Sequence, residues 1–334
     1  MAQFFLGVDV GGTKCHALIA DDQGRAFGFS EGGPGNHEEV GYEGLEKALH
    51  EVTDKALHSA GLTRDQIAGG GFGIAGYDWP SERPETMLAI DSLGLTAKVE
   101  AVNDAIVGLL AGASQGWGVA VVAGTGSNCW GWDLNRHAAH LTGCGRQFGE
   151  YGGAGDLIDK AIEAITLEWS RRAGSTHLTP AFIKAAGATD ATDLIEGLSQ
   201  GRYAIGPYLA PVVIRVAGQG DPVARGLLRW MGRELGDQAR GVIRQLQIED
   251  MEFEVVLVGS LYDGNPLMVD AMRETIQTLA PEARLVRLTA PPVVGGVLLA
   301  MEQCGLDILS MRDALIQSTI EFIRDRKDQT TPTE

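Results

Sequence analysis

The sequence has few cysteines and no long uninterrupted apolar segment. Its four cysteines, in 334 residues, show none of the close spacings of a metal-binding or disulfide-rich domain. We therefore expect reduced thiols, with no structural zinc and no disulfide framework. No apolar stretch approaches the roughly 18 residues that span a bilayer, and no signal-peptide pattern is present. These absences predict a soluble, cytoplasmic protein without a membrane partner.

Basic residues are also scarce. The chain has 27 Lys and Arg against 44 Asp and Glu, a formal net charge of −17. No basic run is long enough to follow a phosphate backbone, so we expect no nucleic-acid partner. What is abundant is glycine, with 46 residues and no Gly-X-Y period, which indicates many turns and close backbone approaches. With 44% hydrophobic residues, a chain of this length predicts a sizeable core divided between two domains.

The stretch 118–132 combines an apolar run of strand length, a Gly-Thr-Gly-Ser turn and a returning strand. Glycines let the backbone approach a ligand closely, and consecutive free N–H groups beside Thr and Ser hydroxyls form a concave anion site. We therefore predict that phosphate binds at Gly124, Thr125 and Gly126. A tight hairpin without a ligand is the alternative interpretation.

The N-terminus repeats this design. An apolar strand at 4–10 is followed by the bare turn Gly11, Gly12, Thr13 and Lys14, by a second strand at 15–20 and by a polar turn. Residues 133–136 form the corresponding polar turn after the second hairpin. The recurrence predicts two copies of one α/β unit whose hairpins face each other and clamp a nucleotide.

The remaining pattern alternates strands and helices. Apolar spacing predicts a helix over 38–60 with Leu45, Leu49, Val52 and Ala56 on its buried face. We place the domain boundary between residues 115 and 116, giving domains of 1–115 and 116–334. Further expected strands are 70–75, 97–102, 253–258 and 285–288, and further expected helices are 81–93, 105–113, most of 180–248, a segment from 266, and 310–323, followed by a frayed polar tail from 324.

Two carboxylates are candidates for chemistry. Asp9 lies in an otherwise apolar strand, where an unpaired carboxylate costs several kcal/mol, so we expect hydrated Mg²⁺ as its partner. The alternative is that Asp9 caps its own Gly-Gly turn. Asp104 follows a predicted strand, and carboxyl ends of strands are where ligands bind in open α/β sheets. It suits a base that accepts a hydroxyl proton during phosphoryl transfer, although Asn103 or Asp104 capping the following helix fits equally well.

Four blocks in order resemble a known family: Gly7 to Lys14, Asn103 to Ala105, Ala123 to Cys129, and Val256 to Ser260. Together they resemble the N-acetylglucosamine kinase and BadF/BadG/BcrA/BcrD-type ATPase family, within the superfamily of sugar kinases, actin and heat-shock chaperones. The resemblance implies an α/β fold of two ribonuclease-H-like domains with ATP and substrate in the cleft between them. It also implies that Gly259 and Ser260 contact adenosine and that Asp104 is the base. We further expect the last helix to pack back on the N-terminal domain.

The resemblance assigns sugar contacts to Asn36, Asp104, Ser127, Asn128 and the loop near Gly145. The family's usual Gly-Asp-Glu-Gly-Ser is replaced by Gly-Glu-Tyr-Gly-Gly at 149–153, with Glu150 at the sugar-binding position. We predict that Glu150 accepts sugar hydroxyls, the alternative being a surface charge ahead of a helix. The expected reaction is ATP-dependent phosphorylation of N-acetylglucosamine to its 6-phosphate by a homodimer.

Three alternatives stay open. The acceptor could be glucosamine or another hexose. The protein could instead be an ATPase that activates a partner enzyme, as in a branch of the family that holds an iron–sulfur cluster between subunits, but the cysteines here show no cluster pattern. A sugar-responsive repressor is disfavoured because the first strand begins at about Gln3, with no helix-turn-helix before it, and the zinc pattern of that family is missing.

Overall fold

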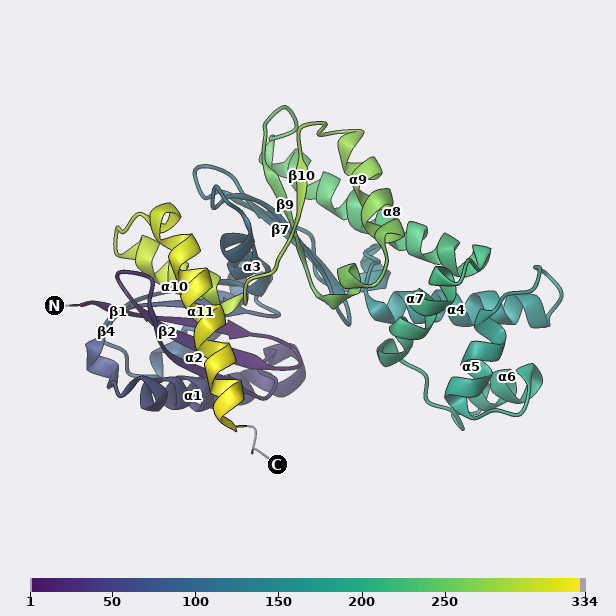
Figure 1. Cartoon of the computed structure of the whole chain (residues 1–334), viewed down its shortest axis with the longest axis horizontal. Helices are drawn as coiled ribbons and strands as arrows, with labels where there is room; N and C mark the ends of the chain where they lie inside the picture. The colour runs from purple at the N-terminus through teal and green to yellow at the C-terminus, as the bar shows by residue number, and fades with distance from the viewer. Residues whose placement is uncertain (1, 331–334) are drawn as a thin grey trace.

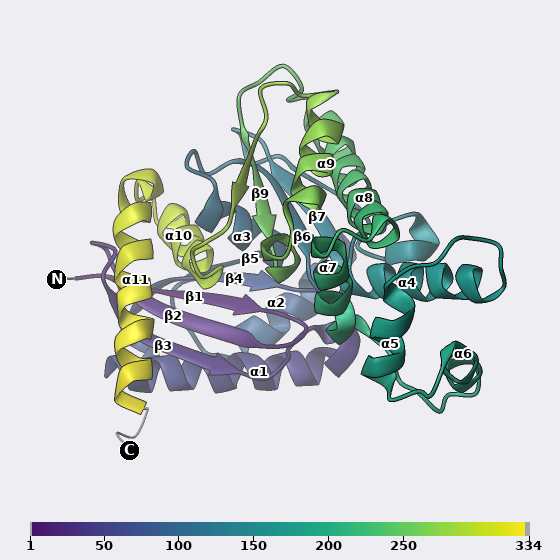
Figure 2. The same cartoon turned by 45° about the vertical axis from the view of Figure 1, so that its right-hand side comes forward.

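The computed structural model describes residues 2–330 and contains two five-stranded sheets with the same strand order (Figures 1 and 2). Sheet 1 has the order β3-β2-β1-β4-β5, and sheet 2 the order β8-β7-β6-β9-β10. The strands of sheet 1 are β1 (Phe4–Val10), β2 (Cys15–Asp21), β3 (Ala26–Gly32), β4 (Ile67–Ile74) and β5 (Lys98–Asn103). Those of sheet 2 are β6 (Gly118–Ala123), β7 (Ser127–Trp132), β8 (Ala138–His140), β9 (Glu254–Val258) and β10 (Arg284–Arg287).

Strand directions repeat as well as strand order. In sheet 1, β2 pairs antiparallel with both β1 and β3, and the pairs β1–β4 and β4–β5 are parallel. In sheet 2, β7 likewise pairs antiparallel with both β6 and β8, and the pairs β6–β9 and β9–β10 are parallel. The repeated unit expected from the two hairpins is therefore confirmed, and the α/β fold with two matching halves is the predicted one. Because β1 and β6 are central in their sheets, the turns that follow them lie at the carboxyl edges of the two halves.

Helices cover both faces of sheet 1. The helix α1 (His37–Ala60) packs against β2 and β3 through its predicted apolar face, and all four predicted residues are buried. Its first turn is set off from the rest by Gly41, which has a φ of 71°. The opposite face is covered by α10 (Val293–Gln303), which contacts β1 and β4. A Cβ on Gly71 would lie 2.1 Å from the Gly296 carbonyl oxygen, so the absence of a side chain permits this close packing.

A short helix, α3 (Asp104–Gly112), lies between the two halves. It contacts α10 and β4 on one side and β6, β7 and β9 on the other. Every residue from Ala105 to Gly112 is buried, which explains why this segment is apolar all round. The helix therefore fixes the position of its first residue, Asp104, relative to both sheets (Figure 1).

Sheet 2 is covered by α8 (Pro222–Leu246), which also packs along α9 (Pro266–Gln277). The segment 180–248 is mostly helical, as expected, and contains α5 (Leu178–Ala186), α6 (Ala191–Ser199), α7 (Ala210–Gly218) and α8, with the short 3₁₀ turn Pro207–Leu209 before α7. The earlier helix α4 (Ala154–Trp169) extends with α5, α6 and α7 to one side of sheet 2 (Figure 1). In the first half of the chain, a further helix, α2 (Arg83–Asp91), packs against α1.

The last helix, α11 (Ile308–Thr330), returns to sheet 1. It contacts β3 and α10 (Figure 2). The Arg312 guanidinium donates to the carbonyl oxygens of Ala111 and Gly112 at the end of α3. The helix is longer than expected, because residues 324–330, predicted as a frayed tail, are helical. Residues 331–334 lie outside the described part of the chain.

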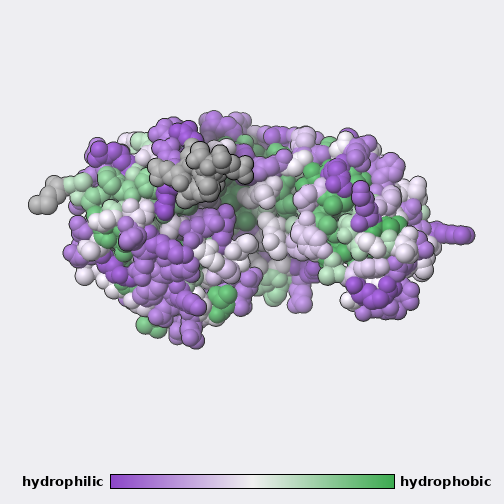
Figure 3. Space-filling model, turned by 60° about the horizontal axis from the view of Figure 1, so that its bottom comes forward, coloured by the Kyte–Doolittle hydropathy of each residue, from purple (hydrophilic) through white to green (hydrophobic). Residues whose placement is uncertain are grey.

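All four cysteines are free thiols, with Cys15 and Cys129 buried and Cys144 and Cys304 exposed. Within the described residues, no helix combines the length and the apolar character needed to cross a membrane. Hydrophilic residues are spread over much of the face shown in Figure 3, interrupted by apolar patches.

Candidate active site

Three carboxylates lie at the carboxyl ends of three neighbouring parallel strands. Asp9 is near the end of β1, Asp78 follows β4, and Asp104 follows β5. The pairing of Val10 with Ile74, and of Ile74 with Asn103, aligns these three strand ends. Asp9 and Asp104 are the carboxylates that the sequence singled out, and the sheet brings them to one edge.

The electrostatics of this edge favour a proton acceptor at Asp104. Burial of its carboxyl group, together with the negative charges of Asp9 and Asp78, raises its pKa to about 7, although backbone hydrogen bonds oppose the shift. A general base works best when its pKa lies near the working pH. Asn103 is the N-cap of α3, since its Oδ1 accepts from Ala105 N at 3.0 Å, and Asp104 is the first residue of the helix.

The pH profile should show this group. If Asp104 accepts the proton of the attacking hydroxyl, it must be ionised, so kcat/KM should rise tenfold per pH unit below pH 7 and level off above it. Initial rates between pH 5.5 and 9 with subsaturating acceptor measure this profile. A flat profile across pH 6 to 8 would contradict an essential base of this pKa.

Asp9 is partly buried, with 15% of its side chain exposed, and its Oδ2 lies 3.7 Å from Nδ1 of His16, its cross-strand neighbour. Within residues 2–326 it makes no hydrogen bond to the Gly11–Gly12 turn, and no group of three or more His, Cys, Asp or Glu side chains forms a metal cage. One carboxylate without hydrogen-bond donors suits Mg²⁺, which keeps most of its waters and takes further oxygens from bound phosphates. The donor set therefore fits a magnesium site at Asp9 and does not fit zinc.

The second hairpin turn, between β6 and β7, is held by the start of α4, a helix later in the chain. Ala154 N and Gly155 N at the start of α4 donate to the carbonyl oxygens of Gly124 and Thr125, at 2.9 and 3.1 Å. A Cβ on Gly153 would lie 2.6 Å from the Gly126 Cα, so only glycine allows this contact. The space beside Gly124 and Gly126 is open, with no protein atom within 4 Å of where a Cβ would stand. The turn is thus rigid on one side and open on the other.

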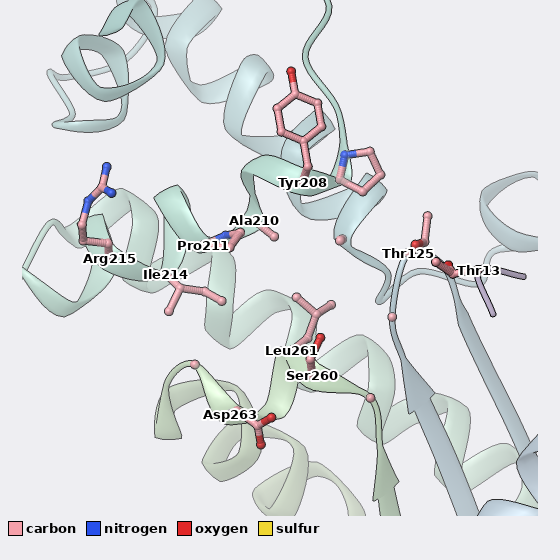
Figure 4. Close-up of a pocket in the computed structure, with 15 residues that line it drawn as sticks. Thr13, Thr125, Tyr208, Ala210, Pro211, Ile214, Arg215, Ser260, Leu261 and Asp263 are labelled. Carbon is pink, nitrogen blue, oxygen red and sulfur yellow. The ribbon is translucent and has the colours of Figure 1, made fainter. Parts of the chain in front are cut away.

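A cavity of about 840 Å³ adjoins this turn (Figure 4). It brings together Thr13 of the first hairpin, Gly124 and Thr125 of the second, and Gly259 and Ser260 after β9. In Figure 4, Thr13 and Thr125 lie toward one end of the lining, and Ile214 and Arg215 of α7 lie toward the other. These are members of all three predicted phosphate and adenosine segments, and the volume suits a nucleotide.

A second cavity of about 660 Å³ lies on the other side of the same turn. Thr125 lines both cavities, and Gly126, Ser127, Gly145 and Glu150 line the second one only. The predicted sugar-contacting residues Ser127, Gly145 and Glu150 therefore share one polar cavity next to the nucleotide-sized one. The other residues that line it are Glu38, Gly143, Cys144, Arg146, Gln147, Gly155 and Asp156.

The profile of the BadF/BadG/BcrA/BcrD ATPase family matches residues 6–300. The chain belongs to this family. It is 25% identical, over 90% of this chain and 99% of the relative, to the N-acetylmuramic acid/N-acetylglucosamine kinase of Clostridium acetobutylicum. It is 26% identical, over 90% of this chain and 98% of the relative, to the N-acetyl-D-glucosamine kinase of Dictyostelium discoideum. The solved ROK family glucokinase of Streptomyces griseus, in complex with glucose and AMPPNP, shares the fold at a TM-score of 0.57, with 18% identity over 90% of this chain and 100% of the other.

In this family member Glu150 is not a surface residue, since it is 7% exposed. Its Oε1 accepts a hydrogen bond from Thr142 N at 2.8 Å, and among the described residues no group donates to its Oε2. The role of a charge at the helix start belongs to Asp156, whose Oδ2 accepts from Gly152 N and Gly153 N at 3.0 and 3.1 Å. Glu150 therefore supports its loop with one oxygen and has the other available in the cavity.

The other predicted residues, Asp9 and Asp104 among them, line neither cavity. Asn36 caps α1, because its Oδ1 accepts from Glu38 N, and it is Glu38 that reaches the second cavity. Lys14 lies 3.9 Å from the exposed Glu31, and Gly11 and Gly12 form the turn beside Thr13. Asn128 donates through Nδ2 to Asp78, a contact that orients its amide. The binding roles of these residues remain predictions.

Several cavity residues of the protein were not identified from the sequence. Pro207, Tyr208, Pro211, Ile214 and Arg215 reach the nucleotide-sized cavity from the helical segment, where the sequence shows only two helix-breaking prolines. The position of Asp78 in the sequence could have identified it as a candidate. It follows the Gly76 turn at a strand end, the same position that singled out Asp104.

Proposed function

We propose that this protein is an ATP-dependent sugar kinase that phosphorylates N-acetylglucosamine on its 6-hydroxyl. The observation that carries the proposal is the shared hairpin turn. One cavity of nucleotide size and one polar cavity meet at Thr125, beside an edge that holds Asp9 and Asp104. Two relatives aligned over nearly their whole length carry the names of kinases of this sugar, which supports the choice of acceptor.

The residues have distinct roles in this reaction. Gly124 N donates to Gly126 O within the turn. The amides of Thr125 and Gly126, with the Thr13 and Thr125 hydroxyls, hold the phosphates of ATP, and Gly124 leaves room for them. The ionised Asp104 accepts the proton of the sugar hydroxyl. As it does so, the oxygen of that hydroxyl forms a bond to the γ-phosphorus, and the bond between this phosphorus and the bridging oxygen of ADP breaks. Mg²⁺ held at Asp9 would neutralise charge on the phosphates.

The proposal extends to how the chain is organised. We assign residues 1–115 and 116–334 to two domains, with α10 and α11 returning to the first domain. The protein acts in the cytoplasm as a homodimer, without a nucleic-acid or membrane partner, and static light scattering should give about twice the 35.4 kDa of one chain.

Glu150 is expected to select the acceptor. Its buried carboxylate lines the polar cavity, and a hydrogen bond to a charged acceptor contributes about 1.5–3 kcal/mol, so Glu150→Ala should raise the KM of the sugar at least about tenfold. ATP affinity should stay unchanged. Steady-state kinetics with each substrate varied in turn measure both.

Glu150→Gln is the matched control, because its amide oxygen can still accept from Thr142 N while the charge is lost. If Glu150 binds the sugar, this variant should still show a raised KM. A wild-type KM in Glu150→Gln would reduce the residue to a support for its loop.

A coupled assay of ADP release against hexoses, amino sugars and N-acetyl amino sugars tests the proposed function. N-acetylglucosamine should give the highest kcat/KM. A higher kcat/KM with glucosamine or another hexose would change the identity of the acceptor sugar but would still support a sugar kinase. ADP release at the same rate with no sugar present would sink the kinase proposal and favour an ATPase that activates a partner.

A further inference from the structure

Asp78 has no role in the function proposed above, yet it touches both halves of the molecule. It is 7% exposed and lies in the loop after β4. Its own backbone is held by Glu82, whose Oε2 accepts from Asp78 N at 2.9 Å and from Trp79 N at 2.8 Å. The carboxylate therefore stands on a fixed loop.

One oxygen of this carboxylate accepts three hydrogen bonds. Asp78 Oδ1 accepts from Nδ2 of Asn103 at 3.0 Å, from Nδ2 of Asn128 at 3.2 Å and from Nε1 of Trp130 at 3.3 Å. Asn103 ends β5 in sheet 1, whereas Asn128 and Trp130 belong to β7 in sheet 2. A single side chain thus joins the two sheets at the end where the two cavities lie.

The two asparagine amides are held at both ends. Asn103 accepts from Ala105 N and so caps α3, the helix that begins with Asp104. Asn128 Oδ1 accepts from Cys129 N at 2.8 Å, and its Nδ2 donates to Asp78. Nδ2 of Asn103 also donates to Tyr77 O at 3.2 Å. Asp78 and Tyr77 thus hold the Asn103 amide next to the base in the chain, and Asp78 holds the Asn128 amide next to Ser127, which lines the polar cavity.

Packing alone would not keep Asp78 in place. A cavity of about 390 Å³ lies beside it, lined from both halves by residues that include Trp79, Trp130 and His140. Across the carboxylate from the asparagines is Gly143 in the loop that lines the polar cavity, where a Cβ would lie 2.8 Å from Asp78 Oδ2. With open space on one side, hydrogen bonds to Oδ1 determine where the side chain sits.

A buried carboxylate of this kind is costly for folding. Within residues 2–326 no Lys or Arg pairs with Asp78, and its burial raises its pKa, although the hydrogen bonds from Asn128 and Trp130 oppose the shift. An unpaired buried charge destabilises the fold unless its hydrogen bonds offset the loss of water. The free-energy cost of burying the Asp78 carboxylate indicates that this residue has a role other than stabilising the fold.

We propose that Asp78 is a positioning residue for sugar phosphorylation, which joins the two halves and holds Asn128, the neighbour of the cavity-lining Ser127, and Asn103, the neighbour of the base. This inference rests on the proposed function. It predicts that Asp78 affects the sugar and the transfer step but not ATP. Asp78 does not line the nucleotide-sized cavity, whereas it lies against Gly143, which lines the polar cavity.

Asp78→Ala and Asp78→Asn test the proposal in the full-length protein. We expect Asp78→Ala to raise the KM of the sugar at least about tenfold and to lower kcat about tenfold, with the Kd of ATP within twofold. Asp78→Asn keeps an oxygen that can accept, so it should recover part of the KM effect. Asp78→Asn should also move the acid limb of kcat/KM to lower pH. Asp9 and Asp78 both raise the pKa of Asp104, and only Asp9 would remain charged in this variant.

Asp221 supplies a matched control. It is 4% exposed and accepts from Thr176 Oγ1, His177 N and Ala224 N, all within residues 176–224, and it lines none of the three cavities described above. Asp221→Asn should lower Tm and leave the KM of the sugar unchanged. In a double-mutant cycle, Asp78→Ala combined with Asn128→Ala should raise KM by less than the product of the two single effects, because the residues act together.

The outcomes separate the inference from the function beneath it. If wild-type protein phosphorylates a sugar and both Asp78 variants keep its KM and kcat, the positioning role is wrong and the kinase stands. Equal losses of ATP and sugar affinity, accompanied by a lower Tm as in Asp221→Asn, would make Asp78 a structural residue. A wild-type protein that phosphorylates no sugar would overturn both.

Discussion

Asp104→Asn should lower kcat by a factor of about 100 or more while the Kd of ATP changes little. The amide keeps the shape of the side chain but cannot accept the hydroxyl proton, and general-base catalysis typically contributes about 10²–10⁴-fold. Helix α3 should be unaffected, because Asn103 and not Asp104 caps it. Steady-state kinetics together with calorimetric titration of ATP give both quantities.

The stability of this variant provides the control. Folding raises the pKa of Asp104 to about 7, so the folded chain binds the proton more tightly than the unfolded chain does. The stabilisation from that proton is complete at low pH, and it is lost as the pH rises toward 7. At pH 8 the ionised carboxylate destabilises the fold, and Asp104→Asn should have a Tm equal to or above that of the wild type. A large drop in Tm, or near-normal turnover, would contradict the assignment of the base.

Gly124→Val should weaken ATP binding about 100-fold, equivalent to about 3 kcal/mol. No protein atom lies within 4 Å of the added Cβ, so the valine side chain would occupy the space that the phosphates need. The fold should tolerate the change, since Gly124 does not have the positive φ that disfavours other residues. Isothermal titration calorimetry measures the affinity, and circular dichroism checks the fold.

Gly174 offers a comparison position. It is another glycine with open space around its Cβ and no positive φ, and it lines neither cavity. Gly174→Val should leave ATP affinity at the wild-type value. Unchanged ATP affinity in Gly124→Val would show that the turn does not hold phosphate.

Local patterns predicted much of this fold. Each hairpin with its bare turn is contiguous in sequence, and its repetition after residue 118 predicted two sheets of one topology, which the strand order confirms. The buried face of α1 followed from its apolar spacing, and Asp104 from its position after a strand. Such features depend on near neighbours in the chain, which a sequence displays directly.

Tertiary contacts account for what was missed. The helical segment supplies Tyr208, Ile214 and Arg215 to the nucleotide-sized cavity only because α7 folds back toward Ser260, and no local pattern marks that approach. The final helix continues past residue 323, where Arg326 donates to Phe29 O of β3 and Ser59 Oγ of α1, whereas its polar sequence suggested fraying. The partners of Asp78 come from residues 25 to 52 positions away, so its role was visible only in three dimensions.

The central claim is that the two cavities hold ATP and a sugar for direct transfer between them. Phosphorus NMR of the protein with ATP, Mg²⁺ and N-acetylglucosamine tests this claim most directly. We expect ADP and one sugar phosphate to form in equal amounts, with the new phosphorus signal coupled to the protons on carbon 6. Release of inorganic phosphate in place of a sugar phosphate, at a rate independent of the sugar, would contradict the account.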